Sequence, residues 1–272
     1  MSRKKSLSIG LALGGGGARG IAHIPMIQIL DEMGIKPVII SGTSMGAIIG
    51  ALFAAGVTGK EMEETMNGLS IKEIGKMVDV DWLSRNGLVK GKGIVKYLSE
   101  IIPANRFEDL QIPLQVVATD FWNRSEVVFS SGDLLEAVRA SISIPGIFTP
   151  VKIGGKVLTD GGLVNPLPYD LIRDECDLLI AVDVSGSNKP DERSGLPSIF
   201  ESIAATFQIM ETALVSNQME QTRPDIYIKP GLTNIQLMDF HKHEEIMLSG
   251  TRAAEKLREA LNKKLRKRRF FI

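Results

Sequence analysis

The sequence predicts an α/β fold of three layers, in which helices cover both faces of a mainly parallel central sheet. Two observations support this class: short apolar runs alternate with helical patterns, and two glycine-containing turns each join a strand to a helix. A chain of 272 residues, 44% hydrophobic and with a net charge of 0, is long enough for one large core. We therefore expect residues 1–272 to form a single domain without internal repeats.

The expected strands are apolar runs bounded by turn residues. They are 7–13, 37–41, 114–119, 156–159, 178–184 and 226–229. Helical patterns over 21–33 and 47–55 follow the first two strands. A parallel strand-helix-strand unit places both connecting turns beyond the carboxyl ends of adjacent strands, where open α/β sheets bind ligands.

The turn after the second strand is Gly42-Thr43-Ser44-Met45-Gly46, at the start of the second helix. Such a sharp turn tolerates little bulk, which explains glycines two residues either side of the serine, and it raises the serine oxygen above the sheet. A nucleophilic serine is our first hypothesis for Ser44. A turn of small residues that only lets strand and helix pack closely would look the same.

The turn after the first strand is the glycine loop, residues 14–20. A glycine loop at a helix N-terminus directs unpaired amides at one point and so binds a phosphate or an oxyanion. A dinucleotide site is disfavoured because the second strand ends without an acid for a ribose, and a P-loop because no Gly-Lys-Ser/Thr follows. An oxyanion hole facing Ser44 fits best, with a plain packing turn as the alternative.

A serine nucleophile needs a base, and none of the three histidines stands in a convincing turn. His23 falls in the first turns of a helix, where we expect packing or surface exposure, and His241 and His243 lie in a polar helix start. Asp160 is the better candidate because it ends a strand and precedes Gly161-Gly162, which permits a sharp turn, with an ordinary Asp-Gly turn as the alternative. Burial would have to raise the pKa of this carboxyl for it to act as a base.

Three motifs in this order, Gly15 to Gly20, Gly42 to Gly46 and Asp160 to Gly162, resemble the patatin-like phospholipase family. Further segments look like its bacterial members: 107–114, 116–120, 140–148 and 165–168. The resemblance implies a patatin-like fold and a Ser–Asp dyad without histidine. One departure is Phe121-Trp122-Asn123-Arg124, where family members usually show a short Thr-Gly turn, and it affects the expected loop shape rather than the dyad.

Carried over to this chain, the resemblance makes Ser44 the nucleophile and Asp160 the proton acceptor. The oxyanion hole would be formed by the amides of Gly15, Gly16 and Gly17. We expect Arg19 and Met45 to contact substrate, with bracing of the loop as the alternative role of Arg19. The glycines with a structural role in the motifs are Gly20, Gly42, Gly46, Gly161 and Gly162.

Two segments are candidates for lipid contact. Residues 61–103 carry apolar side chains, methionines among them, between charges, which suits either a helical cap over the site or ordinary helices on the core. Residues 262–272 include six of the 32 Lys and Arg residues and no acid, which suits docking on an anionic membrane or a solvated helix end. We expect a lipid or ester substrate and no nucleic acid partner, and the sequence leaves the oligomeric state open.

No ligand cluster has the usual spacing, so we expect no metal and no cofactor. The basic start at residues 1–5 faintly resembles a secretory signal, but cleavage after it would remove the glycine loop, and we expect it to be retained. No apolar run is long enough for a spanning helix, and the single cysteine, Cys176, excludes an internal disulfide. We expect a cytoplasmic protein, with peripheral membrane contact as the open alternative.

Together these features predict a serine acyl hydrolase acting on phospholipids, lysophospholipids or simpler carboxyl esters. Two alternatives remain. One is an acyltransferase that uses the same dyad and passes the acyl group to an alcohol or thiol. The other is a catalytically silent regulator that keeps the fold and binds a lipid or a partner.

Overall fold

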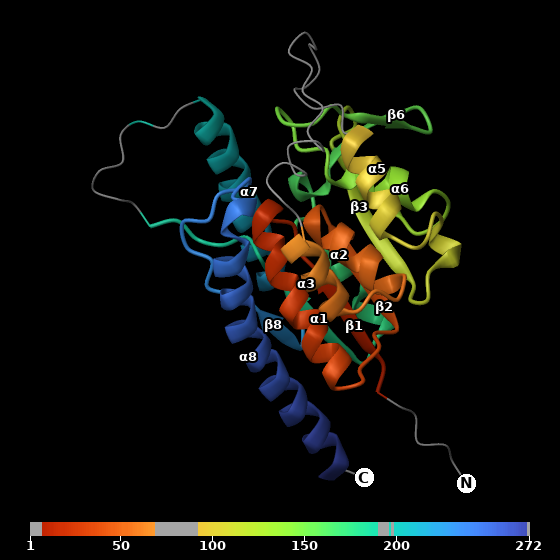
Figure 1. Cartoon of the computed structure of the whole chain (residues 1–272), viewed down its shortest axis with the longest axis vertical. Helices are drawn as coiled ribbons and strands as arrows, with labels where there is room; N and C mark the ends of the chain where they lie inside the picture. The colour runs from red at the N-terminus through yellow and green to blue at the C-terminus, as the bar shows by residue number, and fades with distance from the viewer. Residues whose placement is uncertain (1–6, 69–91, 190–195, 197–198, 271–272) are drawn as a thin grey trace.

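The computed structural model describes residues 7–68, 92–189, 196 and 199–270. Its centre is an eight-stranded sheet with strand order β5-β6-β3-β2-β1-β7-β8, and β4 also pairs with β3 (Figure 1). The strands are β1 Ile9–Leu13, β2 Ile39–Thr43, β3 Leu114–Asp120, β4 Ser125–Phe129, β5 Val151–Ile153, β6 Lys156–Asp160, β7 Leu178–Val182 and β8 Ile226–Ile228.

The sheet has a parallel part and an antiparallel edge. β3, β2, β1, β7 and β8 pair in parallel, which confirms the α/β class and the parallel sheet expected from the sequence. β4 and β6 pair antiparallel with β3, and β5 pairs antiparallel with β6. The sequence did not reveal β4 or β5. The antiparallel direction of β6 matters for the site, because its last residue, Asp160, pairs with Ala118 in the middle of the neighbouring strand.

Helices cover both faces of this sheet. The α-helices are α1 His23–Glu32, α2 Met45–Ala54, α3 Gly59–Gly68, α5 Lys92–Ile101, α6 Leu134–Ser141, α7 Ile199–Gln221 and α8 His243–Phe270. The 3-10 turns are η1 Gly17–Ala22, η2 Phe107–Asp109, η3 Gly161–Leu163, η4 Asp170–Glu175 and η5 Phe240–Lys242. The two helices expected over 21–33 and 47–55 begin at other residues than expected. α1 begins at His23, after η1, and α2 begins at Met45, directly after the serine.

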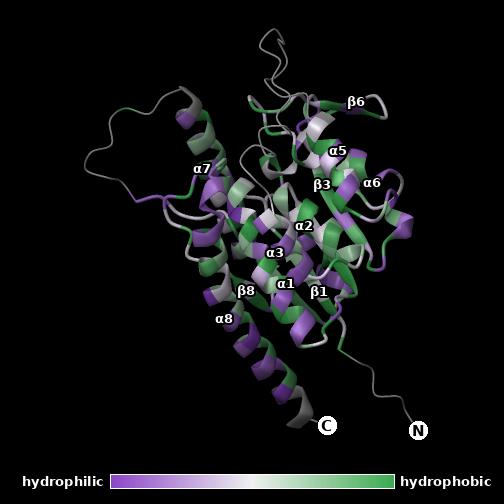
Figure 2. Ribbon diagram, in the orientation of Figure 1, coloured by the Kyte–Doolittle hydropathy of each residue, from purple (hydrophilic) through white to green (hydrophobic). Residues whose placement is uncertain are grey.

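Alternate side chains of the central strands enter two separate cores, as the two-residue period of a strand requires. Leu11 and Leu13 of β1 pack in the larger core with residues of α1, α2, α6 and α8. Ala12, between them, packs on the other face with η4 and with Val215 of α7. The central strands are apolar and buried on both faces (Figure 2), so the parallel part of the sheet is held rigidly under the turns that follow it.

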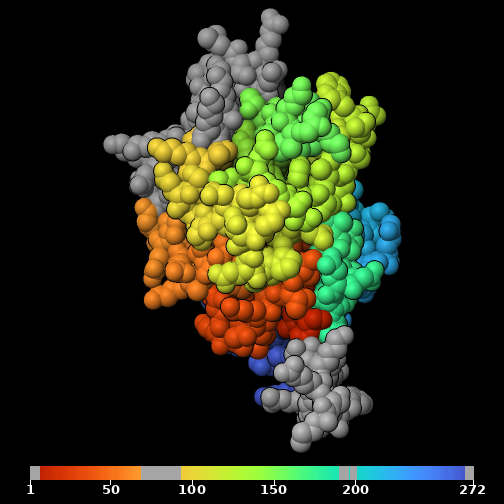
Figure 3. All heavy atoms as spheres, turned by 90° about the vertical axis from the view of Figure 1, so that its right-hand side faces the viewer, coloured from red at the N-terminus to blue at the C-terminus, as the bar shows by residue number. Residues whose placement is uncertain are grey.

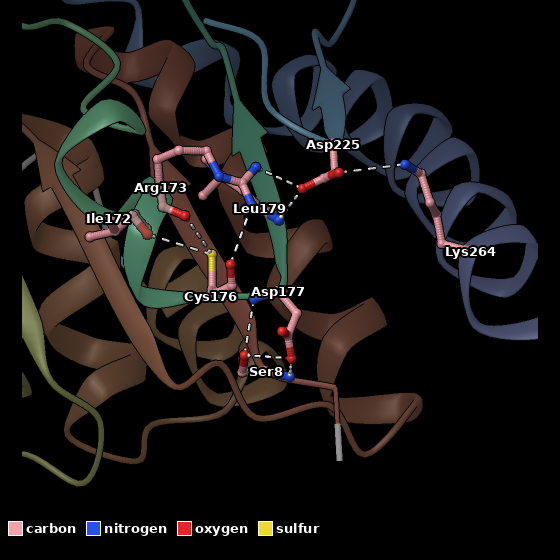
Figure 4. A network of polar contacts seen from close by, with 8 residues as sticks. All are labelled: Ser8, Ile172, Arg173, Cys176, Asp177, Leu179, Asp225 and Lys264. Carbon is pink, nitrogen blue, oxygen red and sulfur yellow. Dashed lines mark hydrogen bonds and ion pairs between the residues drawn. The ribbon is translucent and has the colours of Figure 1, made fainter. Parts of the chain in front are cut away.

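A network of polar contacts stabilises the end of the sheet where β1 and β7 begin (Figure 4). Asp177 accepts hydrogen bonds from the backbone and hydroxyl of Ser8, and Arg173 pairs with Asp225 at 2.7 Å. Lys264 of α8 reaches the other oxygen of Asp225 at 3.6 Å. Cys176, the single cysteine, is half-buried here. These contacts fix the end of the sheet that lies away from the two glycine-containing turns.

The basic segment 262–272 continues α8 as far as Phe270, and its described side chains Lys263, Lys264 and Arg266 are exposed. This end of α8 is hydrophilic and lies at the end of the molecule where β1 enters the sheet (Figures 1 and 2). The parallel strands run from this end toward the glycine-containing turns. The basic segment is therefore at the far end of the molecule from Ser44.

Only parts of the expected cap segment 61–103 are described, namely the end of α3, all of α5 and the residues that follow it. Residues 69–91 lie outside the described part of the chain. Among the described residues, no helix combines the length and the apolar character that crossing a bilayer requires.

Gly46 shows how tightly the serine turn packs on the sheet. A methyl group on Gly46 would lie 2.1 Å from the carbonyl oxygen of Leu13 and 2.8 Å from that of Gly14. On the same helix, a methyl group on Gly50 would meet only side-chain atoms, at 3.2 Å and beyond. The backbone of β1 cannot yield as a side chain can, so the two glycines differ in what they tolerate.

We predict that Gly46→Ala lowers the free energy of unfolding by about 1–3 kcal/mol or more, because it overpacks against backbone. Gly50→Ala is the matched control and should stay within about 1 kcal/mol of wild type, since alanine is the better helix former. Thermal and urea unfolding followed by circular dichroism would measure both. Equal stability of Gly46→Ala and wild type would contradict the close contact.

Candidate active site

Ser44 stands on a strained turn between β2 and α2. Its backbone has φ 54° and ψ −120°, a conformation with positive φ that glycine adopts readily and serine rarely. The backbone N–H of Ser44 donates to Oγ of Ser141, at the end of α6, at 2.9 Å. Strain of this kind persists only where the surroundings enforce it, and it is concentrated at functional sites.

Asp160 meets this serine across 116 residues of sequence: Ser44 Oγ donates to Asp160 Oδ2 at 2.7 Å. The second carboxylate oxygen, Oδ1, accepts the backbone N–H of Gly162 at 2.8 Å. The backbone of Asp160 is held as well, because its N–H donates to Ser143 O at 3.0 Å and its carbonyl accepts Thr119 Oγ1 at 2.7 Å. Both the carboxyl group and the chain that carries it are therefore fixed in place.

The environment of Asp160 changes its proton affinity. The side chain is 1% exposed, and burial raises its pKa to about 7, against the lowering effect of the hydrogen bonds from Ser44 and Gly162. Burial disfavours the charged form of an acid, so a buried carboxylate becomes a stronger base than one in water. Near neutral pH, this carboxyl group is suited to accept a proton from a hydroxyl group.

The glycine loop lies against the serine turn, since a methyl group on Gly15 would touch Ser44 Cβ at 3.4 Å. The amide of Gly15 donates to Pro166 O at 2.9 Å and is not available to an oxyanion, which differs from the expectation for this residue. Within the described residues, no acceptor is recorded for the amides of Gly16 and Gly17. Gly17 has φ 56°, and a side chain there would collide with Leu237 O.

The two expected substrate contacts differ in their surroundings. Arg19 is 2% exposed, and its Nε donates to Gly16 O at 3.1 Å, so its guanidinium braces the glycine loop from inside. Met45 packs over Gly20, where a methyl group would lie 2.2 Å from Met45 Cγ. Met45 also borders a large apolar cavity.

That cavity has a volume of about 190 Å³ and reaches Ser44. Its wall is almost entirely apolar and comes from η1, α2, α3, α5 and the segment around Ile144. Met62 and Met66 of α3 and Ile94 and Leu98 of α5 are among the residues that line it. On the surface of the molecule, the chain around α5 lies next to the chain around α3 (yellow and orange in Figure 3). The described ends of the expected cap segment thus line a hydrophobic space beside the serine.

His23, the histidine next to the glycine loop, is not placed as a base. His23 is fully buried, donates from Nε2 to Gly14 O at 2.8 Å, and burial lowers its pKa to about 4. It therefore packs under the glycine loop as a neutral side chain. His241 lies in η5, and His243 begins α8.

The structure brings two further polar side chains to the site that sequence reasoning missed. Ser141 anchors the amide of Ser44, and Glu211 of α7 lies beside Gly162 with 5% of its surface exposed. Ser141 stands in a segment already singled out, but nothing in the sequence connects it to Ser44. Among the described residues, no group of three or more His, Cys, Asp and Glu side chains is arranged to hold a metal ion.

The chain is similar to several curated proteins. The chain is 39% identical over 192 residues to an uncharacterized NTE family protein of Mycobacterium tuberculosis. The aligned region covers 70% of this chain and 53% of that protein. It is 31% identical over 270 residues to patatin-like phospholipase domain-containing protein 7 of Rattus norvegicus, covering 88% of this chain and 20% of the rat protein. The chain thus spans about half the length of the mycobacterial relative and a fifth of the rat one.

Among solved structures, VipD from Legionella pneumophila superposes with a TM-score of 0.51 at 14% identity, over 93% of this chain and 67% of that chain, and it shares the fold. The family model described as patatin-like phospholipase matches residues 11–172, which include the glycine loop, the serine turn and Asp160. The chain belongs to the patatin-like phospholipase family.

Proposed function

We propose that this protein is a lipid acyl hydrolase that cleaves carboxyl esters with a Ser44–Asp160 dyad. The observation that carries the proposal is the 2.7 Å hydrogen bond from Ser44 Oγ to a carboxyl group whose burial raises its pKa to about 7. A hydroxyl group becomes an effective nucleophile when an adjacent base takes its proton. Asp160 is in position to do so without a histidine.

In the first step, Ser44 Oγ attacks the ester carbonyl while its proton passes to Asp160. The tetrahedral intermediate collapses when Asp160 returns this proton to the leaving alcohol, and an acyl group remains on Ser44. Water then attacks the acyl group in the same way and releases the carboxylic acid. Strain at Ser44 and the fixed backbone of Asp160 keep the two side chains aligned through both steps.

For the oxyanion, we propose the amides of Gly16 and Gly17. Both lie on the loop next to Ser44 and have no recorded acceptor among the described residues, whereas the Gly15 amide is bonded to Pro166 O. Donors fixed in advance stabilise the charge that develops in the transition state. Arg19 assists by holding Gly16 O, and hence the orientation of the peptide that follows it.

The apolar cavity supports a substrate with a hydrocarbon chain, because it adjoins Ser44 and offers almost no polar group. The comparisons support a lipid substrate as well. A protein of Saccharomyces cerevisiae that is 29% identical to this chain over 267 residues is named a lysophospholipase. The dyad would serve an acyltransferase equally well. The cavity and the buried base together favour a working enzyme over a silent binding protein.

The position of α8 bears on membrane contact. Its basic end lies at the end of the molecule away from the carboxyl ends of β1 and β2, where Ser44 stands. Docking of this end on anionic lipid would therefore hold the protein at a surface without directing Ser44 toward it. We propose that lipid enters the cavity independently of the basic segment.

The first test is hydrolysis of short- and long-chain p-nitrophenyl esters by Ser44→Ala and Asp160→Asn. We expect Ser44→Ala to lower kcat by at least about a thousandfold. We expect Asp160→Asn to lower it by about a hundred- to ten-thousandfold, because it removes the base. Circular dichroism would confirm that both variants fold.

Wild type should also react with a fluorophosphonate at Ser44, and Ser44→Ala should not. A folded wild type that is inactive and resists the probe would favour the silent regulator. Full activity of Asp160→Asn beside an inactive Ser44→Ala would refute Asp160 as the base.

The raised pKa of Asp160 predicts a pH dependence. Only the ionised carboxylate accepts a proton, so kcat/KM should rise about tenfold per pH unit below the pKa and level off above about pH 7. A carboxyl group in water would place this limb about three pH units lower. Initial rates between about pH 4.5 and 9 would measure it, and a rate independent of pH across 5 to 8 would contradict the assignment.

The cavity predicts a chain-length selectivity. Met66→Trp adds bulk to its wall, so we expect kcat/KM for a long-chain ester to fall about tenfold or more, with the short-chain rate within about threefold of wild type. Glu64→Trp, on an exposed position of α3, is the matched control. Equal losses for both chain lengths in Met66→Trp would show that acyl chains bind elsewhere.

A further inference from the structure

A second, polar cavity meets Ser44 on the side of Asp160. Its volume is about 10 Å³, which is close to the smallest space that holds a single water molecule. The polar part of its wall is formed by Ser44, Asp160, Arg19, Gln208 and Glu211, with Gly16 and Gly17 of the glycine loop, and the apolar part by Ile144, Ala204, Phe207 and Leu237. Ser44 therefore has an apolar space for a chain on one side and, on the other, a space of water size that several polar side chains border.

Glu211 closes this polar cavity from α7. A methyl group on Gly162 would lie 2.5 Å from Glu211 Oε1 and 3.1 Å from Asp160 Oδ1, so the two carboxyl groups approach one point from two elements. Within the described residues, no hydrogen bond or ion pair to the Glu211 carboxyl group is recorded. A buried carboxyl group that faces a polar cavity is expected to bond to a molecule inside it.

The charge around Glu211 favours its neutral form near neutral pH. Burial raises its pKa to about 8, and the carboxylates of Asp160 and Asp183 add to this, while Arg19 of η1 acts in the opposite direction. A neutral carboxyl group still offers its carbonyl oxygen as an acceptor. It therefore accepts a hydrogen bond without placing a second negative charge beside Asp160.

We propose that Glu211 positions the hydrolytic water of the deacylation step. The inference rests on the proposed function, since it concerns the release of an acyl group from Ser44. A water molecule in the polar cavity has the Asp160 carboxylate on one side and the Glu211 carbonyl oxygen on the other. It thus has an acceptor for each of its two hydrogens.

In the acyl-enzyme, Ser44 Oγ is esterified and no longer donates to Asp160 Oδ2, so that oxygen accepts a hydrogen from the water. The water oxygen attacks the acyl carbonyl carbon as its proton passes to Asp160, and the second hydrogen stays bonded to Glu211. The bond from the carbonyl carbon to Ser44 Oγ then breaks, and Asp160 returns the proton to Oγ. Water has split the ester into the acid and the free serine, and Glu211 begins and ends neutral.

The test compares acylation and deacylation in Glu211→Leu, which removes the acceptor, and Glu211→Gln, which keeps a carbonyl oxygen. A p-nitrophenyl ester releases p-nitrophenol on acylation, and mass spectrometry of the intact protein follows the loss of the acyl group from Ser44. We expect Glu211→Leu to acylate within about threefold of wild type and to deacylate about ten- to a hundredfold more slowly. Glu211→Gln should deacylate within about threefold of wild type.

The control is Glu220→Leu, an exposed position on the same helix, which should behave as wild type. Deacylation of Glu211→Leu at the wild-type rate would overturn the inference, as would equal slowing of both steps, which would indicate a structural role. Equal slowing of deacylation in Glu211→Gln and Glu211→Leu would also overturn it. A folded wild type that never acylates Ser44 would refute the proposed function itself.

Discussion

The hydrogen bond between Ser44 and Asp160 is the interaction on which the site depends, and both its geometry and its burial are set by the sheet. β2 delivers the serine from a parallel strand, and β6 delivers the aspartate from an antiparallel one, with β3 between them. Because β3 pairs with both strands, the register of a single strand fixes the relative height of the two side chains. The antiparallel edge is thus part of the site as well as of the fold.

Three buried acids near the site show how their surroundings decide their charge. Burial alone would raise the pKa of Asp183, but Lys229, the Tyr227 hydroxyl and the Ser185 backbone hold it below its usual value. Asp160 has fewer donors, and Glu211 has no recorded one among the described residues, so burial raises the pKa of both. Asp183 is therefore held in its ionised form by its partners, whereas burial brings the pKa values of Asp160 and Glu211 close to neutral pH.

The sequence reveals those features in which a local turn restricts the residue types that fit. Ser44 between two glycines and Asp160 before two glycines are visible because each turn restricts what fits. The antiparallel strands β4 and β5 were missed because short, half-exposed runs at an edge lack the apolar continuity of a buried strand. Glu211 was missed because a helix sequence does not reveal which acid turns inward, and the bond of the Gly15 amide to Pro166 depends on tertiary packing.

The positive φ of Ser44 makes the hydroxyl group of this residue costly for the stability of the fold. A serine held there costs on the order of 1–3 kcal/mol, whereas glycine adopts the same backbone without that penalty. Selection for heat resistance alone would therefore favour glycine at position 44 and would erase the hydroxyl group. A library of thermostable variants of this chain has to hold that codon fixed, because a glycine there would remove the hydroxyl group on which the proposed mechanism depends.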